Sequence, residues 1–150
     1  MPQSLSCVHI HLVFSTKDRY PFIDDHIRES LHRYTATVFT NIECRPIIIN
    51  SVEDHIHSLF VLDRKIAICD VVEHVKVASS KWMKTQGTQY EDFFWQGGYG
   101  DFGVSASDVD SVRAYIANQR EHHKQYSFQD EYRMFLHRHA ITYDERHVWD

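Results

Sequence analysis

The sequence predicts an α+β protein with a ferredoxin-like, or split βαβ, fold: an antiparallel sheet with helices on one face, plus a C-terminal helix that bears a tyrosine. Two observations predict it. Segments with strand or helix periodicity follow one another as strand, helix, strand, strand, helix, strand, and further helices then complete the chain. The 150 residues, 43% hydrophobic and 25% charged, have the length and composition of a single domain over 1–150.

The first strand and helix are expected near the start of the chain. Every second residue from Val8 to Phe14 is apolar, which predicts a strand over 6–15 with one buried face. A helix is expected over about 24–40, capped by Asp24 or Asp25. Its apolar residues at helical spacing are Ile27, Leu31, Tyr34 and Val38.

A hairpin and a second helix are expected next. The segments 43–52 and 55–62 are rich in Ile and Val and flank a polar pair, which predicts two adjacent strands. Asp70 and Glu73 resemble a capping box that opens a helix ending at Gly87.

The last third of the chain predicts one more strand and two helices. The strand is expected over 99–105, and Ser107 is expected to cap a helix over about 108–125. A short helix over about 128–138 and an extended tail follow. The core residues of the longer helix are expected to be Val109, Val112 and Ile116.

Charge and hydropathy argue against some classes of protein. A net charge of −5 argues against a protein that coats long stretches of nucleic acid, although it leaves room for a local basic groove. The start has no signal-peptide pattern and no apolar run approaches the roughly 20 residues of a membrane helix. We therefore expect a cytoplasmic protein without a membrane partner. The odd number of cysteines, without C-x-x-C spacing, predicts reduced core residues at Cys7, Cys44 and Cys69.

Histidine is the unusual residue type, with twelve copies. His55 and His57, separated by one isoleucine, open a predicted strand, where residues i and i+2 face the same side and both imidazoles can reach one metal ion. The spacing alone is a weak signal, because His9 and His11 repeat it on the first strand. We expect His9 and His11 to be structural or DNA-facing, with a lesser alternative that His11 lies beside the metal.

The predicted helix 108–125 adds a second group of polar residues. Tyr115 and Gln119 are four residues apart and share one helical stripe, and His122 falls close to the same line. An amide oxygen beside imidazole suits Mg²⁺ or Mn²⁺ better than zinc. The third metal ligand is expected to be Gln119, with His122 as the alternative.

A tyrosine beside such a metal indicates covalent catalysis. A phenol has a pKa near ~10 and is a poor nucleophile at neutral pH without assistance. A bound cation would polarise a phosphodiester and neutralise charge in the transition state. A phosphotyrosine link then stores the ester, so that a 3'-hydroxyl can reverse the reaction.

Four separated segments carry a resemblance to a known family. They are HLVFSTKDRYP at 11–21, DHIHSLFVL at 54–62, FWQGGYGDFGVS at 94–105 and YIANQREHH at 115–123. Together they span most of the chain, and the sequence resembles the single-tyrosine HUH transposases of the insertion-sequence-200-like group and those associated with repetitive extragenic palindromes. One departure is Ser58 after the second histidine, expected to point away from the metal.

The resemblance implies a metal-dependent DNA strand transferase and single-strand endonuclease. Its members cleave single-stranded DNA near hairpins at element ends through a 5'-phosphotyrosine with a free 3'-hydroxyl, as homodimers that join their sheets. Carried over to this chain, His55, His57 and Gln119 hold the metal and Tyr115 is the nucleophile. Whether the tyrosine serves its own subunit or the partner's stays open.

Basic and aromatic residues are candidates for contact with DNA. Aromatic rings that could stack on unpaired bases are Trp95, Tyr99 and Phe102, with core packing favoured for Trp95 and Phe102. Candidate phosphate contacts are Lys17, Arg19, Lys76, Lys81, Lys84, Arg113, Arg120 and Lys124. The competing function is a non-catalytic single-stranded nucleic-acid-binding module that uses an open ferredoxin-like sheet.

Overall fold

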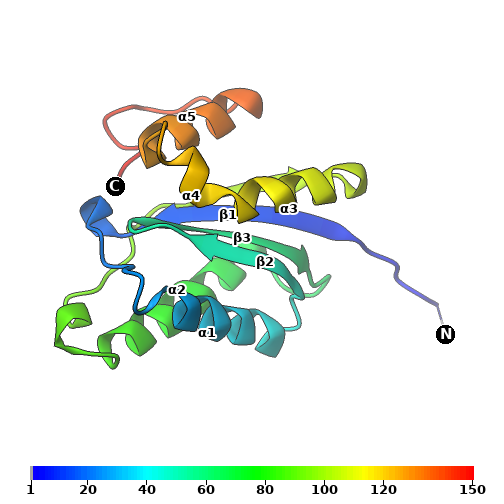
Figure 1. The fold of residues 1–150 in the computed structure, drawn as a ribbon. Helices are drawn as coiled ribbons and strands as arrows, with labels where there is room; N and C mark the ends of the chain where they lie inside the picture. The colour runs from blue at the N-terminus through cyan, green and yellow to red at the C-terminus, as the bar shows by residue number, and fades with distance from the viewer. Residues whose placement is uncertain (1) are drawn as a thin grey trace.

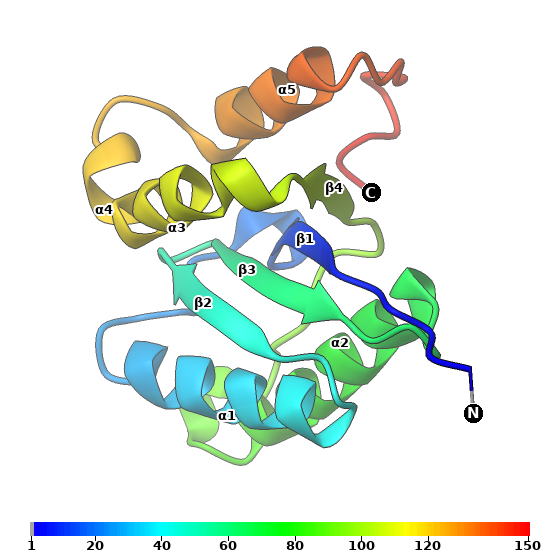
Figure 2. The same ribbon diagram turned by 90° about the vertical axis from the view of Figure 1, so that its right-hand side faces the viewer.

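The computed structural model describes residues 2–150 and arranges them in three layers (Figures 1 and 2). A central sheet lies between α1 and α2 on one face and α3, α4 and α5 on the other. The strands are β1 (Val8–Ser15), β2 (Pro46–Ser51), β3 (His55–Leu62) and β4 (Gly100–Val104). The helices are α1 (Arg28–Asn41), α2 (Ile68–Lys84), α3 (Val109–Ala117), α4 (Gln119–His122) and α5 (Phe128–Arg138).

The sheet has the order β2-β3-β1-β4, and every neighbouring pair is antiparallel. This order and the α+β class confirm the ferredoxin-like prediction. In the register of β1 against β3, Val13 lies opposite His57 and Ser15 opposite His55. Because directly paired residues point to the same face, both histidines face α3 and α5.

The opposite face of the sheet holds the larger apolar core. Leu12 and Phe14 of β1 and Ile56 and Phe60 of β3 are almost fully buried there against α1 and α2. Ser58 points to this same side, away from the histidines, as expected, and its hydroxyl is buried without a hydrogen-bond partner.

The second face of the sheet is covered as well, which corrects the expectation of strands with one buried face. From Ile10 to Ser15 every residue of β1 is buried. A smaller apolar cluster covers this side, where apolar residues of α5 pack over β1 and β4. Its buried members are Val13, Phe102, Phe128, Tyr132, Phe135 and Leu136.

Two helix starts differ from the predictions. The first helix begins at Arg28, because residues from Asp24 form a turn in which the Asp24 carboxylate accepts from the Ile27 N–H at 3.1 Å. The second begins at Ile68 with Ala67 at its N-cap, so the capping box predicted at Asp70 is absent. The backbone of Ala67 is extended, and the helix starts after it, about one turn earlier than Asp70 and Glu73 indicated.

The predicted helix 108–125 is broken at Asn118 into α3 and α4, and Ser107 lies in a preceding 3-10 turn rather than at a cap. The Asn50 side chain of β2 donates to the carbonyls of Ile116, at 2.8 Å, and Ala117, at 3.3 Å. A side chain from the sheet therefore satisfies carbonyls that would accept from backbone N–H groups if the helix were continuous.

The C-terminal region agrees with the prediction in its helix but not in its tail. Helix α5 has the predicted bounds, and Ser127 caps it by accepting from the Asp130 N–H at 3.1 Å. The tail after α5 folds back instead of extending, and the Asp150 carbonyl accepts from the Gly98 N–H at 3.0 Å. None of the helices in residues 2–150 combines the length and hydropathy that a membrane span requires.

The cysteines within the described residues are free thiols, as expected. Only Cys44 is a core residue, because Cys7 and Cys69 are exposed. The prediction of three buried cysteines is therefore wrong for two of them.

A half-buried histidine of α1 makes the stability of the fold depend on pH. His32 Nε2 lies 2.7 Å from Ser51 Oγ, and burial, aided by the positive charge of Arg28, lowers the His32 pKa from 6.5 to about 4. The unfolded chain binds this proton near pH 6.5 and the folded chain only near pH 4, so stability falls as pH decreases across that window.

We expect His32→Gln to reduce this acid sensitivity. Between pH 6.5 and 4 the wild type should lose up to about 3 kcal/mol of unfolding free energy more than the variant. Urea unfolding at the two pH values measures the difference, with His26→Gln on the exposed surface as the control. Equal pH dependence in wild type and His32→Gln would contradict the assignment.

Candidate active site

The two histidines of β3 lie side by side beneath α5, and neither has any exposed surface. Their Nε2 atoms approach one carboxylate: His57 Nε2 is 2.8 Å and His55 Nε2 3.2 Å from Glu131 Oε1. The strand geometry predicted this convergence of the imidazoles, but the carboxylate comes from α5.

Glu131 lies at the centre of this cluster. It is 3% exposed and also lies 3.3 Å from His123 Nε2, measured to its Oε1 atom. Its Oε2 atom accepts hydrogen bonds from the Tyr115 hydroxyl and, at 3.2 Å, from Gln119 Nε2. Helices α3, α4 and α5 thus each contribute a side chain beside the two histidines.

Tyr115 and Gln119 lie where the sequence placed them, on the site side of their helices. The Tyr115 ring centroid is 6.3 Å from that of His57, within the same chain. Gln119 is fully buried, and its Oε1 atom lies 3.4 Å from His55 Nε2. The phenol, the amide and both imidazoles therefore converge without a second copy of the chain.

The two histidines that follow Gln119 have different positions. His123 joins the cluster, with its Nε2 atom 3.0 Å from Gln119 Oε1. The ring of His122 instead stacks on Tyr115, with centroids 4.4 Å apart. The residue near the candidate ligands is thus His123, which the sequence analysis did not single out, and not His122.

Each histidine of β3 has its second ring nitrogen held by a partner behind the cluster. His55 Nδ1 lies 2.7 Å from the Asp54 carboxylate. His57 Nδ1 lies 2.7 Å from Nε2 of His11, which is 2% exposed. Both Nε2 atoms are thereby directed at the common centre, as in many metal sites. The lesser expectation, that His11 lies beside the site, is the one that holds, whereas half-exposed His9 does not reach it.

The buried charges shift the acid–base behaviour of these groups. Burial opposes protonation of His55, but hydrogen bonds to Asp54 and Glu131 outweigh it and raise the His55 pKa to about 9. Burial favours the protonated form of Glu131, yet the electrostatic interaction with His57 and the hydrogen bonds of the histidines hold the Glu131 pKa well below its usual range.

The tyrosine is held in its protonated form. Burial and the negative charge of Glu131 raise the pKa of the Tyr115 phenol above its ordinary value. In this arrangement the phenol is a hydrogen-bond donor and a weak nucleophile.

The donor set of this cluster fits a divalent cation. One ligand atom from each of His55, His57, His123 and Glu131 lies within 4.8 Å of the others. Gln119 Oε1 adds an amide oxygen at the edge of the same group. A buried carboxylate among imidazole nitrogens has the charge and ligand types that such an ion requires.

The predicted DNA-contacting residues occupy several different surfaces. Lys76, Lys81 and Lys84 belong to α2, on the face of the sheet opposite the histidines. The Lys76 ammonium donates to the carbonyls of Gln96, at 2.8 Å, and Gly98, at 2.9 Å, so it has a structural role. Lys17 and Arg19 lie in the turn after β1. Arg113 belongs to α3, Arg120 to α4, and Lys124 follows α4, and these helices cover the face of the sheet that bears the histidines.

The aromatic candidates are mostly core residues. Trp95 and Phe102 are buried, as favoured, and Tyr99 is half-buried. An exposed ring missed by the sequence analysis is Phe94, which the Lys84 ammonium approaches to 3.9 Å.

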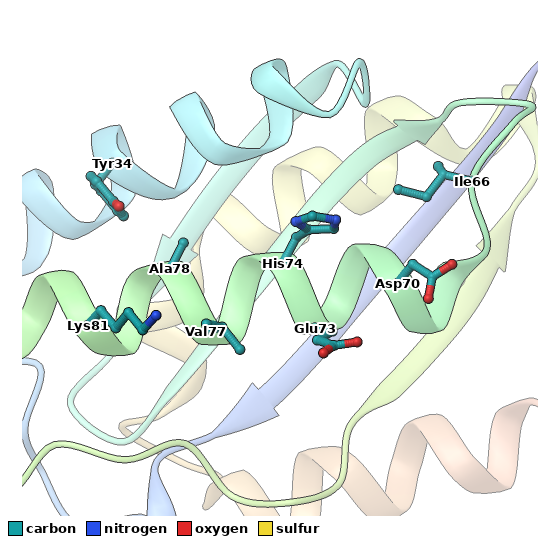
Figure 3. A pocket seen from close by; sticks show the side chains of 8 residues that line it. All are labelled: Tyr34, Ile66, Asp70, Glu73, His74, Val77, Ala78 and Lys81. Atoms are coloured by element: carbon teal, nitrogen blue, oxygen red, sulfur yellow. The ribbon is translucent and has the colours of Figure 1, made fainter.

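A surface groove of about 610 Å³ lies between α1 and α2, away from the histidine cluster (Figure 3). Asp70, Glu73 and His74 line it, but they spread along the helix instead of pointing at a common centre. The convergent chemistry of the molecule is therefore on the other face of the sheet.

A family model described as "Transposase IS200 like" matches residues 4–119. The chain belongs to the IS200-like transposase family. The matched segment of this transposase includes both histidines of β3, Tyr115 and Gln119, and the family is one of DNA-cleaving enzymes. It ends before α5, so Glu131 lies outside the family model. No curated protein matches the chain.

Two solved structures share the fold of this IS200-like transposase. A candidate transposase from Deinococcus radiodurans aligns with a TM-score of 0.62 and 21% identity, covering 79% of this chain and 98% of that one. A REP-associated tyrosine transposase bound to a REP hairpin aligns with a TM-score of 0.60 and 10% identity, covering 82% of this chain and 72% of that one. At these identities the similarity concerns the fold.

One signal for Glu131 was present in the sequence. Phe128, Glu131 and Phe135 fall on one stripe of the predicted helix 128–138, so an acidic residue interrupts its apolar face. A charge at such a position is rarely buried without a partner. His123 also carried a signal, because it follows Gln119 by four residues, the spacing at which side chains of one helix are neighbours.

We expect Glu131→Gln to lower the His55 pKa from about 9, because the variant removes a buried negative charge. Proton–carbon NMR of the histidine rings across a pH titration, with chelator present, measures it. Glu121→Gln, whose carboxylate is exposed and pairs with Lys124, is the matched control. An unchanged His55 titration in Glu131→Gln would contradict the described coupling.

Proposed function

We propose that this transposase cleaves and rejoins single-stranded DNA through covalent attack by Tyr115. The observation that carries the proposal is the convergence of the Tyr115 hydroxyl, both imidazoles of β3 and the Gln119 amide on one buried carboxylate. Membership of the IS200-like family supplies the reaction class.

The proposed step is an in-line transesterification. The Tyr115 phenol gives up its proton and its oxygen forms a bond to phosphorus while the bond from phosphorus to the 3'-oxygen breaks, and the departing 3'-oxygen takes up one proton, so that the proton count is unchanged. The products are a 5'-phosphotyrosine and a free 3'-hydroxyl. The reverse attack by a 3'-hydroxyl rejoins the strand, so neither direction consumes a nucleotide cofactor.

A divalent metal is part of the proposal, held by His55, His57 and Gln119 with Glu131 and His123 as further candidate ligands. When bound, such an ion polarises the phosphodiester and neutralises its developing charge. The imidazole-rich donor set favours Mn²⁺ over Mg²⁺, which prefers oxygen ligands.

The described arrangement corresponds to a resting form of the proposed enzyme. Glu131 holds the phenol protonated, and α5 covers the histidines so that they have no exposed surface. A phosphate can meet Tyr115 only after this cover is displaced and the phenol has separated from the carboxylate.

The proposed substrate is DNA that carries a hairpin at an element end. The related REP-associated tyrosine transposase was solved with a REP hairpin, which supports this choice of partner. Arg113, Arg120 and Lys124, on or after the helices that cover the cluster, are predicted phosphate contacts, and Lys17 and Arg19 in the turn after β1 are further candidates. A homodimer remains a prediction of the resemblance, and action within one subunit is the form we propose for Tyr115.

The competing function, a non-catalytic module with an open sheet, is less well supported. It requires accessible aromatic rings on the sheet face that α1 and α2 leave free. In this chain His11, Val13 and Phe102 of that face are buried beneath α5.

We expect Tyr115→Phe to abolish a covalent protein–DNA product. The test incubates the chain with a labelled single-stranded hairpin oligonucleotide and Mn²⁺, followed by denaturing electrophoresis. Tyr126→Phe is the control, because Tyr126 is exposed and lies outside the cluster. A covalent band that survives in Tyr115→Phe would place the nucleophile elsewhere.

We expect Gln119→Ala to weaken Mn²⁺ binding by about 10-fold or more, and His122→Ala to leave it within about 2-fold. The reason is that Gln119 Oε1 lies in the cluster, whereas the His122 ring stacks on Tyr115. Thermal unfolding at increasing Mn²⁺ measures the difference, since an ion that binds only the folded state raises its stability. The reverse pattern would make His122 the third ligand.

A further inference from the structure

His11 forms a buried contact that the proposed reaction does not use. It lies on β1, two residues before Val13, which pairs with His57, so His11 is on the same face and its side chain meets His57 diagonally across the strands. The two rings stack with centroids 5.0 Å apart, and Nε2 of His11 is 2.7 Å from Nδ1 of His57.

The surroundings fix the His11 ring in this position. Phe135 of α5 packs edge-on against it at 5.0 Å between centroids, and Phe102 of β4 lies on a third side at 6.3 Å. The side chain is thus clamped by three elements, and its hydrogen bond to His57 is directed by packing.

The chemistry of imidazole gives this hydrogen bond a consequence. A histidine that binds a metal through Nε2 must carry its proton on Nδ1, and that proton needs an acceptor. For His55 the acceptor is the Asp54 carboxylate. For His57 the atom in place is Nε2 of His11.

We propose that His11 is a positioning residue that accepts the Nδ1 proton of His57 and so keeps the His57 Nε2 lone pair directed at the metal centre. This inference rests on the proposed function, because it concerns the same cation. It assigns the two histidines of β3 different partners, a carboxylate for His55 and an imidazole for His57.

The remaining ring nitrogen of His11 must then carry a proton. His11 lines a cavity of about 320 Å³ whose wall includes the polar side chains of Asp108, Ser111 and His139. This cavity offers a polar environment to the second nitrogen, which the apolar core on the other face of the sheet would not.

The test measures Mn²⁺ binding by calorimetry in the intact chain. His11→Phe fills the space without an acceptor, and we expect its affinity to fall by about 10- to 100-fold. His11→Gln places an amide oxygen near the former Nε2 position and should stay within about 3-fold of wild type, a rescue that a purely packing role does not produce. His9→Phe, on the same strand but outside the cluster, is the matched control and should bind normally.

The outcomes separate this inference from the proposed function. Wild-type chain that binds no Mn²⁺ overturns the metal-centred function, and the role of His11 with it. Normal binding by wild type and by His11→Phe overturns only the role of His11, as does equal loss in His11→Gln and His11→Phe. The loss in His11→Phe should also be recovered in DNA cleavage at saturating Mn²⁺, since the residue does not touch the substrate.

Nitrogen NMR keeps the inference testable if His11→Phe fails to fold. In wild-type chain loaded with diamagnetic Zn²⁺, the ring of His57 should be protonated at Nδ1 and that of His11 at Nδ1 alone. A His57 ring without a proton on Nδ1 in the loaded chain would overturn the assignment.

Discussion

The buried carboxylate of Glu131 is the constraint around which this half of the molecule is organised. A charge at 3% exposure requires compensation, and three imidazoles, a phenol and an amide provide it. Removing one partner of such a buried pair typically costs about 3–5 kcal/mol. The same interactions that hold α5 on the sheet therefore raise the His55 pKa and keep Tyr115 protonated.

The sheet register determines which residues can take part. With Val13 opposite His57, the odd-numbered residues of β1 face α5 and the even-numbered ones enter the larger core. A slip of one residue in β1 would replace His11 with an apolar neighbour and turn the hydrogen-bonded imidazole toward α1. Precise strand pairing is thus a condition for the chemistry as well as for the core.

The sequence predicted what depends on local periodicity. Strand alternation located His55 and His57 on one face, and helical spacing brought Tyr115 and Gln119 together on the side of the site. It could not predict the helix break at Asn118, where the carbonyl of Ile116 accepts from the side chain of Asn50 on a distant strand. The pairing of His11 with His57 likewise depends on how β1 and β3, which are far apart in the sequence, align in the sheet.

The closure of α5 over the histidines has a kinetic consequence. With the ring nitrogens of His55 and His57 shielded from solvent, an ion or a solvent proton reaches them only through local opening of the C-terminal helix. Binding and release of an ion would then both be limited by the rate of this opening. An ion trapped during folding would be retained long after free ion is withdrawn, so a chelator added to the folded protein would strip it at a rate independent of chelator concentration.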